Sequence, residues 1–367
     1  MKKIVFLITN LEIGGAEKVL IDLVNLLKND YSITVLTLYG KGSLIKDLPN
    51  EVIYKSINSS SYREMNYFKR KLTSLLIKCP LTRKYLYKKY LENKYDVEIA
   101  FLEGPMTTLA NTKCKNNVKK IAWIHTDMSS HYSKEKYSSI VKDYMNYEKI
   151  IFVSHDAKDK FQLVDVNKKL IDKEEVIHNY IDIERVMKRS MNKLALPFED
   201  ENINFLVVSR LVQAKGIDRL IKVHKKLIDK KLYHNIYVIG DGILYNELNK
   251  LKNDLGVSDT FHLLGQKENP YPYIKNCTYL LMPSYYEGFG MVLVEGMILG
   301  KNIIITDTAA KEVVRNYSNH IVCKNDFDDL FKTLQKVINK KIKFNNKENK
   351  LYEQKEIIDK MKKVIEE

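Results

Sequence analysis

The chain has 367 residues, of which 45% are apolar and 29% are charged. This length suits two domains that each bury a core, and the composition is too apolar for a disordered protein. The net charge of +15 indicates an anionic partner, but it does not decide among nucleic acid, anionic lipid and a phosphorylated substrate. The four cysteines lack metal-ligand spacing, so neither a zinc site nor a disulfide framework is expected, and a reducing cytoplasm fits best.

The first residues, MKKIVFLITNLEIGG, hold only five consecutive apolar residues after two lysines. That run is too short for a signal peptide and predicts a first β-strand. No later run is long enough to span a bilayer, so we expect a soluble or peripheral protein.

Short apolar runs alternate with amphipathic, lysine-rich stretches along the whole chain. This rhythm predicts α/β architecture, with two doubly wound Rossmann-like domains built on parallel sheets. We place the first domain at residues 1–190, the second at 200–350 and a closing helix at 351–367. The predicted linker, KRSMNKLALPFEDEN, loses strand character and gathers charges around Pro197. The runs that predict strands are KIVFLIT, ITVLTL, DVEIAF, KIAWIH, KIIFVS, INFLVVS, NIYVIG, FHLLG, YLLMPS and NIIITD.

In parallel α/β sheets, ligands bind beyond the carboxyl ends of the strands, so the expected site is a cleft between the two domains. Gly14 and Gly15 follow the first predicted strand and precede a helix, where the backbone can approach an anion. A tight strand-to-helix connection explains the pair equally well. The dinucleotide fingerprint GxGxxG is absent from this turn, which disfavours a dehydrogenase.

Arg210 and Lys215 lie between the buried run LVVS and the next predicted helix. Two cations in such a loop could converge on a diphosphate. A solvated basic loop is the alternative in a chain so rich in lysine.

Glu287 and Glu295 flank the turn and helix of PSYYEGFGMVLVEGMILG. A carboxylate in an apolar helix costs free energy unless it accepts hydrogen bonds, and paired ribose hydroxyls are suitable donors for Glu295. Glu287 could hold sugar hydroxyls or stabilise positive charge at an anomeric carbon. Helix capping by Glu287 is the structural alternative, but it does not explain the second glutamate.

The segment EGFGMVLVE resembles the E-x7-E signature of retaining, GT-B-fold glycosyltransferases of family 4. Other segments occur in the family's order: GGAEKVLIDL, SRLVQAKGIDRLI, VIGDGILYNEL and LLGQ. The resemblance covers most of the second half well and the first half loosely, and it implies a GT-B fold with a nucleotide-sugar donor site in the second domain.

By this resemblance, Arg210 and Lys215 hold the donor diphosphate, Glu295 binds the nucleotide ribose and Glu287 lies beside the donor sugar. Gly15 would cover the phosphates when the cleft closes. The backbone NH groups that would face sugar and phosphate are those of Phe289, Gly290, Met291 and Val292.

His125 ends the run KIAWIH, where members of the family often place a histidine that contacts the donor sugar. A lone histidine is more often structural, and both interpretations stay open.

The resemblance implies catalysis without a metal, a cofactor or a side-chain nucleophile. The leaving phosphate would help to deprotonate an acceptor that attacks on the same face, and preorganised cations would supply most of the rate. The pattern from Asp326 to Asp328 follows a strand and opens a helix, so capping explains it better than metal binding.

Residues 63–94 carry ten Lys or Arg and two Glu, with aromatic and leucine residues interleaved. This segment could lie on an anionic membrane. A solvated helical pair packed on the sheet is the alternative. We rank nucleic acid lowest because no recognised binding module is present.

The leading hypothesis is a glycosyltransferase at the cytoplasmic face of the membrane that extends a lipid-linked glycan from a nucleotide sugar. UDP is favoured because it is common in the family. The lysine, asparagine and isoleucine usage resembles that of low-GC bacteria, where such enzymes build capsule or exopolysaccharide. The alternatives are a non-enzymatic partner subunit and a sugar-nucleotide 2-epimerase on the same fold.

Overall fold

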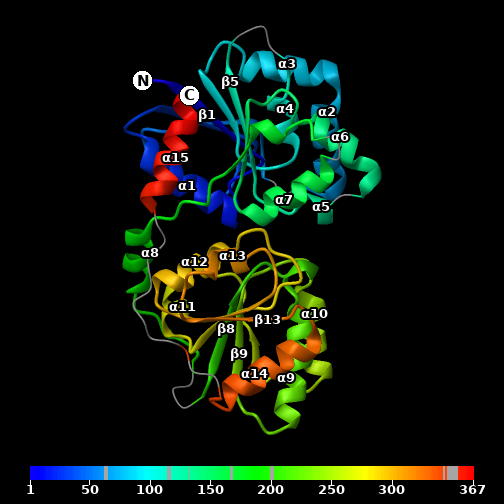
Figure 1. Cartoon of the computed structure of the whole chain (residues 1–367), viewed down its shortest axis with the longest axis vertical. Helices are drawn as coiled ribbons and strands as arrows, with labels where there is room; N and C mark the ends of the chain where they lie inside the picture. The colour runs from blue at the N-terminus through cyan, green and yellow to red at the C-terminus, as the bar shows by residue number, and fades with distance from the viewer. Residues whose placement is uncertain are drawn as a thin grey trace. The chain divides into compact units, whose positions relative to one another are not determined.

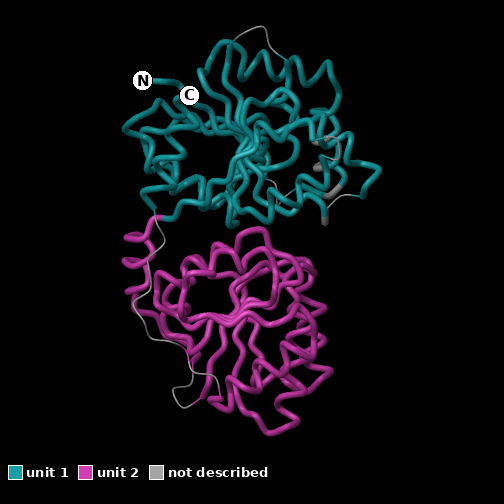
Figure 2. The backbone as a smooth tube through the Cα atoms, in the orientation of Figure 1, with its two compact units in different colours: residues 1–181, 354–367 teal, residues 182–353 magenta. Residues whose placement is uncertain are grey.

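The computed structural model describes residues 1–61, 65–113, 117–131, 133–165, 168–198, 202–341, 344 and 354–367. The chain forms two compact units, residues 1–181 with 354–367, and residues 182–353 (Figure 2). The predicted domains, residues 1–190 and 200–350, have different limits from these units. Helix α8 (Ile183–Ser190) belongs to the second unit because it packs against α11 (Tyr271–Asn276) and α12 (Met291–Ile298).

Unit 1 is built on a seven-stranded parallel sheet with the order β3-β2-β1-β4-β5-β6-β7 (Figure 1). The central strands are apolar on both faces, and every residue of β1 from Ile4 to Ile8 is fully buried. This burial is what helices on both sides of a parallel sheet require. The strands are β1 (Lys3–Ile8), β2 (Ser32–Lys41), β3 (Ile53–Ser61), β4 (Val97–Ala100), β5 (Lys119–Ile124), β6 (Lys149–Phe152) and β7 (Glu174–Val176).

The helices of unit 1 begin and end where local chemistry sets their limits. The Asn66 side chain accepts a hydrogen bond from the Lys69 NH at the start of α2, and Pro80, which has no NH, opens α3. The α-helices are α1 (Gly15–Leu27), α2 (Tyr67–Lys78), α3 (Pro80–Tyr90), α4 (Pro105–Ala110), α5 (Met128–His131), α6 (Tyr137–Lys142), α7 (His155–Val164) and α15 (Gln354–Glu366). Short 3₁₀ turns lie at Ile45–Asp47, Lys134–Lys136 and Ile171–Lys173.

The last helix, α15, closes the first unit rather than the second. Lys2 Nζ lies 3.1 Å from the carbonyl oxygen of Ile365 and 3.0 Å from the Glu366 carboxylate. The Gln354 amide donates to the carbonyl of Ile181. The two ends of the chain therefore meet in one unit.

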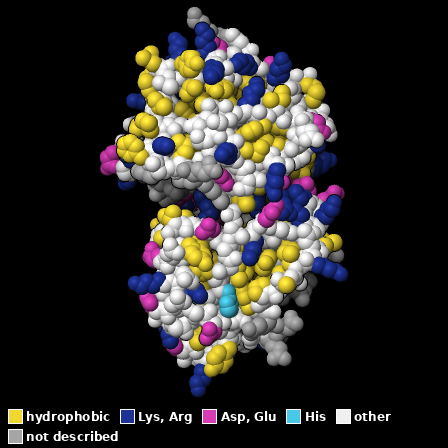
Figure 3. Space-filling model, turned by 180° about the vertical axis from the view of Figure 1, so that it is seen from behind, with side chains coloured by type: hydrophobic (Ala, Val, Ile, Leu, Met, Phe, Trp, Pro, Cys, Tyr) yellow, Lys and Arg dark blue, Asp and Glu magenta, His cyan; other side chains and the backbone are white. Residues whose placement is uncertain are grey.

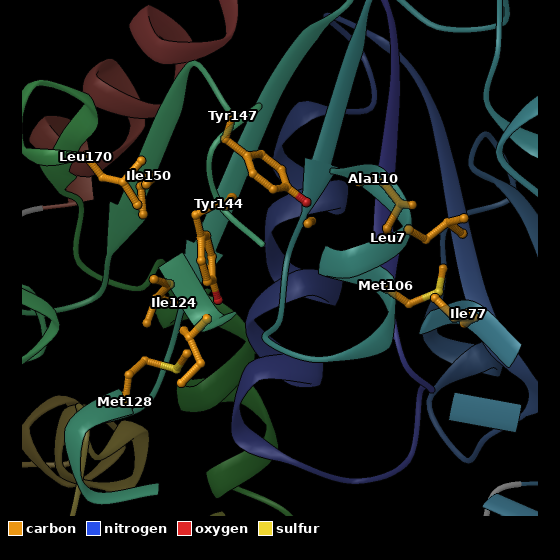
Figure 4. Packing of buried hydrophobic residues seen from close by; sticks show 14 of the residues in the cluster. Leu7, Ile77, Met106, Ala110, Ile124, Met128, Tyr144, Tyr147, Ile150 and Leu170 are labelled. Atoms are coloured by element: carbon orange, nitrogen blue, oxygen red, sulfur yellow. The ribbon is translucent and has the colours of Figure 1, made fainter. Parts of the chain in front are cut away.

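The core of unit 1 also fixes α2, α3 and α4. Met106 of α4 lies beside Ile77 of α2 (Figure 4). The Tyr87 hydroxyl of α3 donates to Glu98 Oε1 at 2.8 Å, and Lys120 Nζ lies 3.8 Å from Glu98 Oε2. Because all three polar groups are buried together, α3 is tied to the sheet by hydrogen bonds as well as by packing.

Unit 2 is a six-stranded parallel sheet with the order β10-β9-β8-β11-β12-β13, and helices lie on both sides of it (Figure 1). The two sheets confirm the predicted α/β class. The strands are β8 (Asn204–Val208), β9 (Asn235–Ile239), β10 (Phe261–Leu263), β11 (Tyr279–Met282), β12 (Asn302–Thr306) and β13 (His320–Cys323). The remaining helices are the 3₁₀ turn Gln213–Lys215, α9 (Ile217–Asp229), α10 (Tyr245–Asp254), α13 (Lys311–Val314) and α14 (Phe327–Ile338).

All the predicted apolar runs form strands, and three further strands were missed. They are β3, β7 and β13, and each lies at an edge of its sheet. Strands β3 and β7 are rich in polar residues and lack the continuous apolar run of a strand covered on both faces. Strand β13, with the sequence HIVC, has only three apolar residues in a row. Among the described helices, none is long and apolar enough to cross a bilayer.

Two histidines form a hydrogen-bonded chain in the core of unit 2. His234 Nδ1 lies 2.7 Å from the Leu232 carbonyl oxygen, which can only accept, so this nitrogen carries the proton. His234 Nε2 then accepts from His224 Nδ1 at 2.9 Å, and His224 Nε2 accepts from the Thr260 hydroxyl at 2.8 Å. This is the pattern that two neutral rings form. Burial lowers the pKa of His224 to about 2 and that of His234 to about 4.

We expect unit 2 to lose stability as the pH falls below 6.5, the ordinary pKa of histidine. A folded pKa below the unfolded one gives stability that is present above pH 6.5 and is lost as the pH falls toward about 4. Each histidine contributes about 1.4 kcal/mol per pH unit to the slope in this range. Hydrogen exchange of the β9 amides, corrected for the intrinsic rate, measures it, and His224→Gln should give a shallower slope. An unchanged slope in that variant would contradict the assignment.

Candidate active site

The loops that follow β8 and β11 are joined by backbone hydrogen bonds in unit 2. The carbonyl oxygen of Ala214 accepts from the NH of Tyr285 at 2.8 Å and from the NH of Tyr286 at 3.2 Å. Lys215 Nζ lies 2.5 Å from Glu287 Oε2, and each side chain is only 15% exposed. The structure thus brings together two of the predicted site residues, which are 72 positions apart in the sequence.

Gly216 sets how closely these loops approach. It has a φ of +63° and precedes α9, and a Cβ atom there would lie 2.3 Å from the carbonyl oxygen of Pro283. Both the left-handed backbone and the lack of space require glycine. The approach of the Lys215 loop to the Glu287 loop therefore depends on this residue having no side chain.

Arg219 forms hydrogen bonds that hold the same loop in place, and the sequence analysis did not identify this residue. Its guanidinium donates to the Pro283 carbonyl at 2.7 Å and to Asn325 Oδ1 at 2.9 Å, and it lies 4.3 Å from the centre of the Tyr285 ring. Asn325 in turn donates to the Tyr285 carbonyl at 2.8 Å. Arg219 is 5% exposed, and burial lowers its pKa. The sequence places this charged residue between Ile217 and Leu220, two apolar residues that are buried in α9, and this position could have indicated that Arg219 is buried.

Helix α12 begins without a side-chain cap. Its N-cap is Gly290, with a φ of +79°, so Glu287 does not cap this helix and pairs with Lys215 instead. The first-turn NH groups of Met291 and Val292 have no acceptor within the helix by geometry. The side chain of Phe289, next to Gly290, is buried. The NH groups of this helix start have no helical acceptor, and their contact with an anion stays a prediction.

Glu295 lies in α12 and is 5% exposed, as its apolar neighbours implied. The Tyr271 hydroxyl donates to Glu295 Oε1 at 3.2 Å. A carboxylate has about four acceptor positions, so this bond leaves Glu295 able to accept from further hydroxyls.

Arg210 lies two residues after β8 with its side chain exposed, and it is not part of the Lys215–Glu287 pair. Its neighbours are held close to the loop after β9. A Cβ atom on Gly240 would lie 1.7 Å from the Ser209 carbonyl oxygen, and the Leu211 NH donates to the backbone carbonyl oxygen of Asp241 at 2.9 Å. The position of the Arg210 backbone is therefore fixed, while its side chain is at the surface.

In unit 1, His125 follows β5 and is held by a carboxylate that the sequence analysis missed. Glu103 Oε1 accepts from the NH of His125 at 2.6 Å, from the NH of Thr126 at 2.8 Å and from the Thr126 hydroxyl at 3.1 Å. Burial raises the pKa of Glu103. Its position two residues after the run DVEIAF, before Gly104 and Pro105, was a possible signal.

The His125 imidazole lies among the rings of Phe101 and Trp123, with centroids 4.9 and 6.3 Å away. Burial lowers its pKa to about 3, so the ring is neutral, and it hydrogen-bonds to the backbone of Phe101. Its Nε2 is buried and has no hydrogen-bond partner in the described structure. A neutral ring whose other nitrogen donates to a carbonyl has an acceptor lone pair on Nε2, which suits a hydroxyl donor.

Gly15 is the first residue of α1 and is exposed. The Glu17 side chain lies over this helix start, because a Cβ atom on Gly14 would be 2.1 Å from Glu17 Oε2. In this arrangement a carboxylate, rather than open space, faces the turn that was predicted to cover phosphates.

The Asp326 carboxylate accepts from the Asp329 NH at 2.8 Å and caps α14, as expected. Among the described residues, no group of three or more His, Cys, Asp or Glu side chains has the geometry to hold a metal ion.

We expect Gly216→Ala to loosen the loop of residues 283–290, because its Cβ would push against the Pro283 carbonyl. Hydrogen exchange in this loop should rise at least tenfold, which corresponds to about 1.4 kcal/mol. Gly256→Ala is the matched control, since Gly256 has a φ of +65° but nothing lies within 4 Å of its Cβ position. If both substitutions raised hydrogen exchange in this loop equally, the contact with the Pro283 carbonyl would not be the cause, and the strain of the left-handed backbone would explain the effect.

We expect Glu103→Ala to free the loop of His125 and to raise the pKa of that histidine from about 3 toward its ordinary value. Glu103→Gln retains an oxygen at the same position and should keep the pKa low. Titration of the His125 ring protons by NMR distinguishes the two variants. If the pKa stayed low in Glu103→Ala, Glu103 would not position the ring.

Residues 189–357 match the family model "Glycosyl transferases group 1". A glycosyltransferase of Methanocaldococcus jannaschii, MJ1059, is 27% identical over 55% of this chain, which spans about half (52%) of that relative's length. The Campylobacter jejuni N-acetylgalactosamine-N,N'-diacetylbacillosaminyl-diphospho-undecaprenol 4-alpha-N-acetylgalactosaminyltransferase is 27% identical, with 84% of this chain and 81% of that protein covered.

Solved structures show the same fold. The structure of Anabaena HepE in complex with UDP and glucose has a TM-score of 0.73 and 17% identity, and it covers 100% of this chain and 99% of that one. Residues 189–357 are therefore similar to the glycosyl transferases group 1 family, and they lie in a chain whose two units have the GT-B fold.

Proposed function

We propose that the chain transfers a sugar, with retention of anomeric configuration, from a UDP-sugar to a lipid-linked glycan that becomes part of a cell-surface polysaccharide. The observation that carries the proposal is the Lys215–Glu287 pair at the start of α12, with the buried Glu295 in the same helix. The Campylobacter relative, whose name specifies a diphospho-undecaprenol acceptor, and the UDP-bound HepE structures support the choice of substrates.

In this proposal the diphosphate of the donor binds Lys215 and Arg210. The Lys215 ammonium has three NH donors, so its bond to Glu287 leaves two for phosphate oxygens. The exposed Arg210 side chain is free to turn toward the same anion, and a guanidinium can contact it with two donors. The NH groups at Phe289, Gly290, Met291 and Val292 would complete the anion site.

The two glutamates then serve different parts of the donor. Glu295, with one acceptor position used by Tyr271, would accept the two ribose hydroxyls. Glu287 would lie beside the sugar and stabilise positive charge near its anomeric carbon. Because Glu287 also orients the Lys215 ammonium, it would link sugar recognition to the charge on the leaving group.

The reaction breaks the bond between the anomeric carbon and the β-phosphate oxygen, and the diphosphate leaves with the electron pair. The acceptor hydroxyl oxygen bonds to the same face of that carbon, and its proton passes to a phosphate oxygen of the leaving group. Lys215 and Arg210 would stabilise the charge that develops on the diphosphate, which is where preorganised cations lower a barrier most. The scheme uses no metal ion and no side-chain nucleophile.

In unit 1, we assign to His125 a contact with a sugar hydroxyl, through its neutral and buried Nε2. Gly15 stays a predicted phosphate contact, which would require Glu17 to move from the helix start. A lipid-linked acceptor would place the enzyme at the inner face of the cell membrane.

We expect the wild type to bind one of UDP, GDP, ADP and CMP selectively, with UDP preferred and no metal added. Glu295→Ala should weaken that binding at least tenfold, because ribose hydroxyls lose a charged acceptor worth about 1.5–3 kcal/mol. Titration calorimetry measures both. Glu247→Gln, an exposed acid of α10, is the control.

Unchanged affinity in Glu295→Ala would remove its ribose role, and no binding of any nucleotide by the wild type would favour the partner-subunit alternative. Incubation of the UDP-sugar without acceptor separates the remaining alternative, because a 2-epimerase would alter the sugar whereas a transferase needs the acceptor.

A further inference from the structure

Helix α2 exposes an apolar stripe. Phe68, Leu72, Leu75 and Leu76 are 76%, 52%, 51% and 48% exposed. Their spacing of four, three and one places them on one face of the helix. Ile77, on the opposite face, is 1% exposed and packs in the core of unit 1. The helix is therefore anchored by one face while its other apolar face is presented to solvent.

Helix α3, which begins at Pro80 and contacts α2, also exposes large apolar residues. Leu81 and Tyr85, one turn apart, are 82% and 62% exposed, while Tyr87 is 2% exposed and holds the helix to Glu98. Large apolar residues scattered singly on a surface are ordinary, but a contiguous group marks an interaction site.

The charges that α2 and α3 themselves carry are all positive, and Asp143 is an acidic neighbour of Lys78 and Arg83. Residues 67–90 contain eight Lys or Arg and no Asp or Glu. On the helical spacing of 100° per residue, Lys69 lies on one side of the α2 stripe and Lys71 and Lys78 lie on the other. Basic and apolar side chains are interspersed on the visible face of unit 1 (Figure 3).

This combination distinguishes between two kinds of partner. Lysine is depleted in protein–protein interfaces, whose buried centres exclude charge. A helix that lies in a membrane interface has the opposite pattern, with Phe and Leu on one face and lysines at the level of the headgroups. The charge complementarity therefore favours a surface of anionic lipid.

We propose that α2 and α3 form a lipid-docking surface, in which Phe68, Leu72, Leu75, Leu76 and Leu81 enter the headgroup boundary and the lysines contact anionic headgroups. The purpose of this surface rests on the proposed function, because a lipid-linked acceptor lies in the bilayer. The binding of lipid itself does not depend on it.

Flotation of the full chain with vesicles tests the proposal. We expect binding to phosphatidylcholine vesicles that contain about one-third phosphatidylglycerol, weaker binding at high salt, and little binding to phosphatidylcholine alone. The double variant Leu72→Ser/Leu76→Ser should reduce the partition coefficient at least tenfold. Its control is Leu163→Ser, an exposed leucine of α7 that is 62% exposed and lies outside the surface.

A second pair of variants tests how much the lysines contribute to vesicle binding. Lys69→Glu/Lys71→Glu should also weaken binding at least tenfold, since each lysine near an anionic surface contributes about fivefold. Lys222→Glu/Lys250→Glu changes the net charge equally on exposed helical positions of unit 2 and should have a smaller effect. Equal losses in the two variants would show general attraction by net charge and would overturn the proposed surface.

Cys79, which lies exposed between α2 and α3, reports insertion directly. Hydrogen bonding from the Thr82 backbone lowers its pKa, which favours labelling of this thiol. With Cys114 changed to Ser, a fluorophore on Cys79 should shift to shorter wavelength on anionic vesicles. An unchanged spectrum with bound vesicles would place the contact elsewhere and overturn the proposal.

Calorimetry with UDP on the same variants separates this proposal from the proposed function. Stripe variants that bind UDP but not vesicles would support both. Vesicle binding without any nucleotide binding would support only the docking surface. Stripe variants that bind vesicles like the wild type would overturn the docking surface, whatever their affinity for UDP.

Discussion

The site in unit 2 depends on the contact between the loops that follow β8 and β11. One carbonyl oxygen, that of Ala214, accepts two NH groups of the second loop, and the Lys215–Glu287 pair closes the contact at the side-chain level. Gly216 permits the approach, and Arg219 holds the Pro283 carbonyl from the other side. An ion pair that is mostly removed from water needs this support, because the attraction between its charges offsets the free energy of desolvation only when the geometry is fixed.

Two buried carboxylates of unit 1 are held in a similar way. Glu98 of β4 meets Lys120 of β5 and the hydroxyl of Tyr87, and burial still raises the pKa of Glu98 to about 7. Glu103 accepts three donors from the neighbouring loop. In each case the partner comes from a different segment, so these groups fix tertiary contacts as well as satisfying hydrogen bonds.

The central strands and the α/β class were predictable because a strand covered on both faces has a continuous apolar sequence. Edge strands such as β7 lack that signal. The limits of the two units depend on packing: contacts with α11 and α12 assign α8 to unit 2, and hydrogen bonds with Lys2 assign α15 to unit 1. Glu103 and Arg219 were missed for a related reason. Each acts on a backbone group that is distant in the sequence, which local patterns do not encode.

The sequence by itself determined the α/β class and the central strands, placed Lys215, Glu287 and Glu295 at strand ends and in a short helix, and located the basic segment. Periodicity and spacing are local properties of the chain, so the sequence alone is enough to predict these features. Only the tertiary structure decided that Lys215 pairs with Glu287, that the Nε2 of His125 is buried without a partner, and that the apolar stripe of α2 faces outward. Pairing and exposure depend on which segments the folded chain brings together, and that is a property of the whole chain.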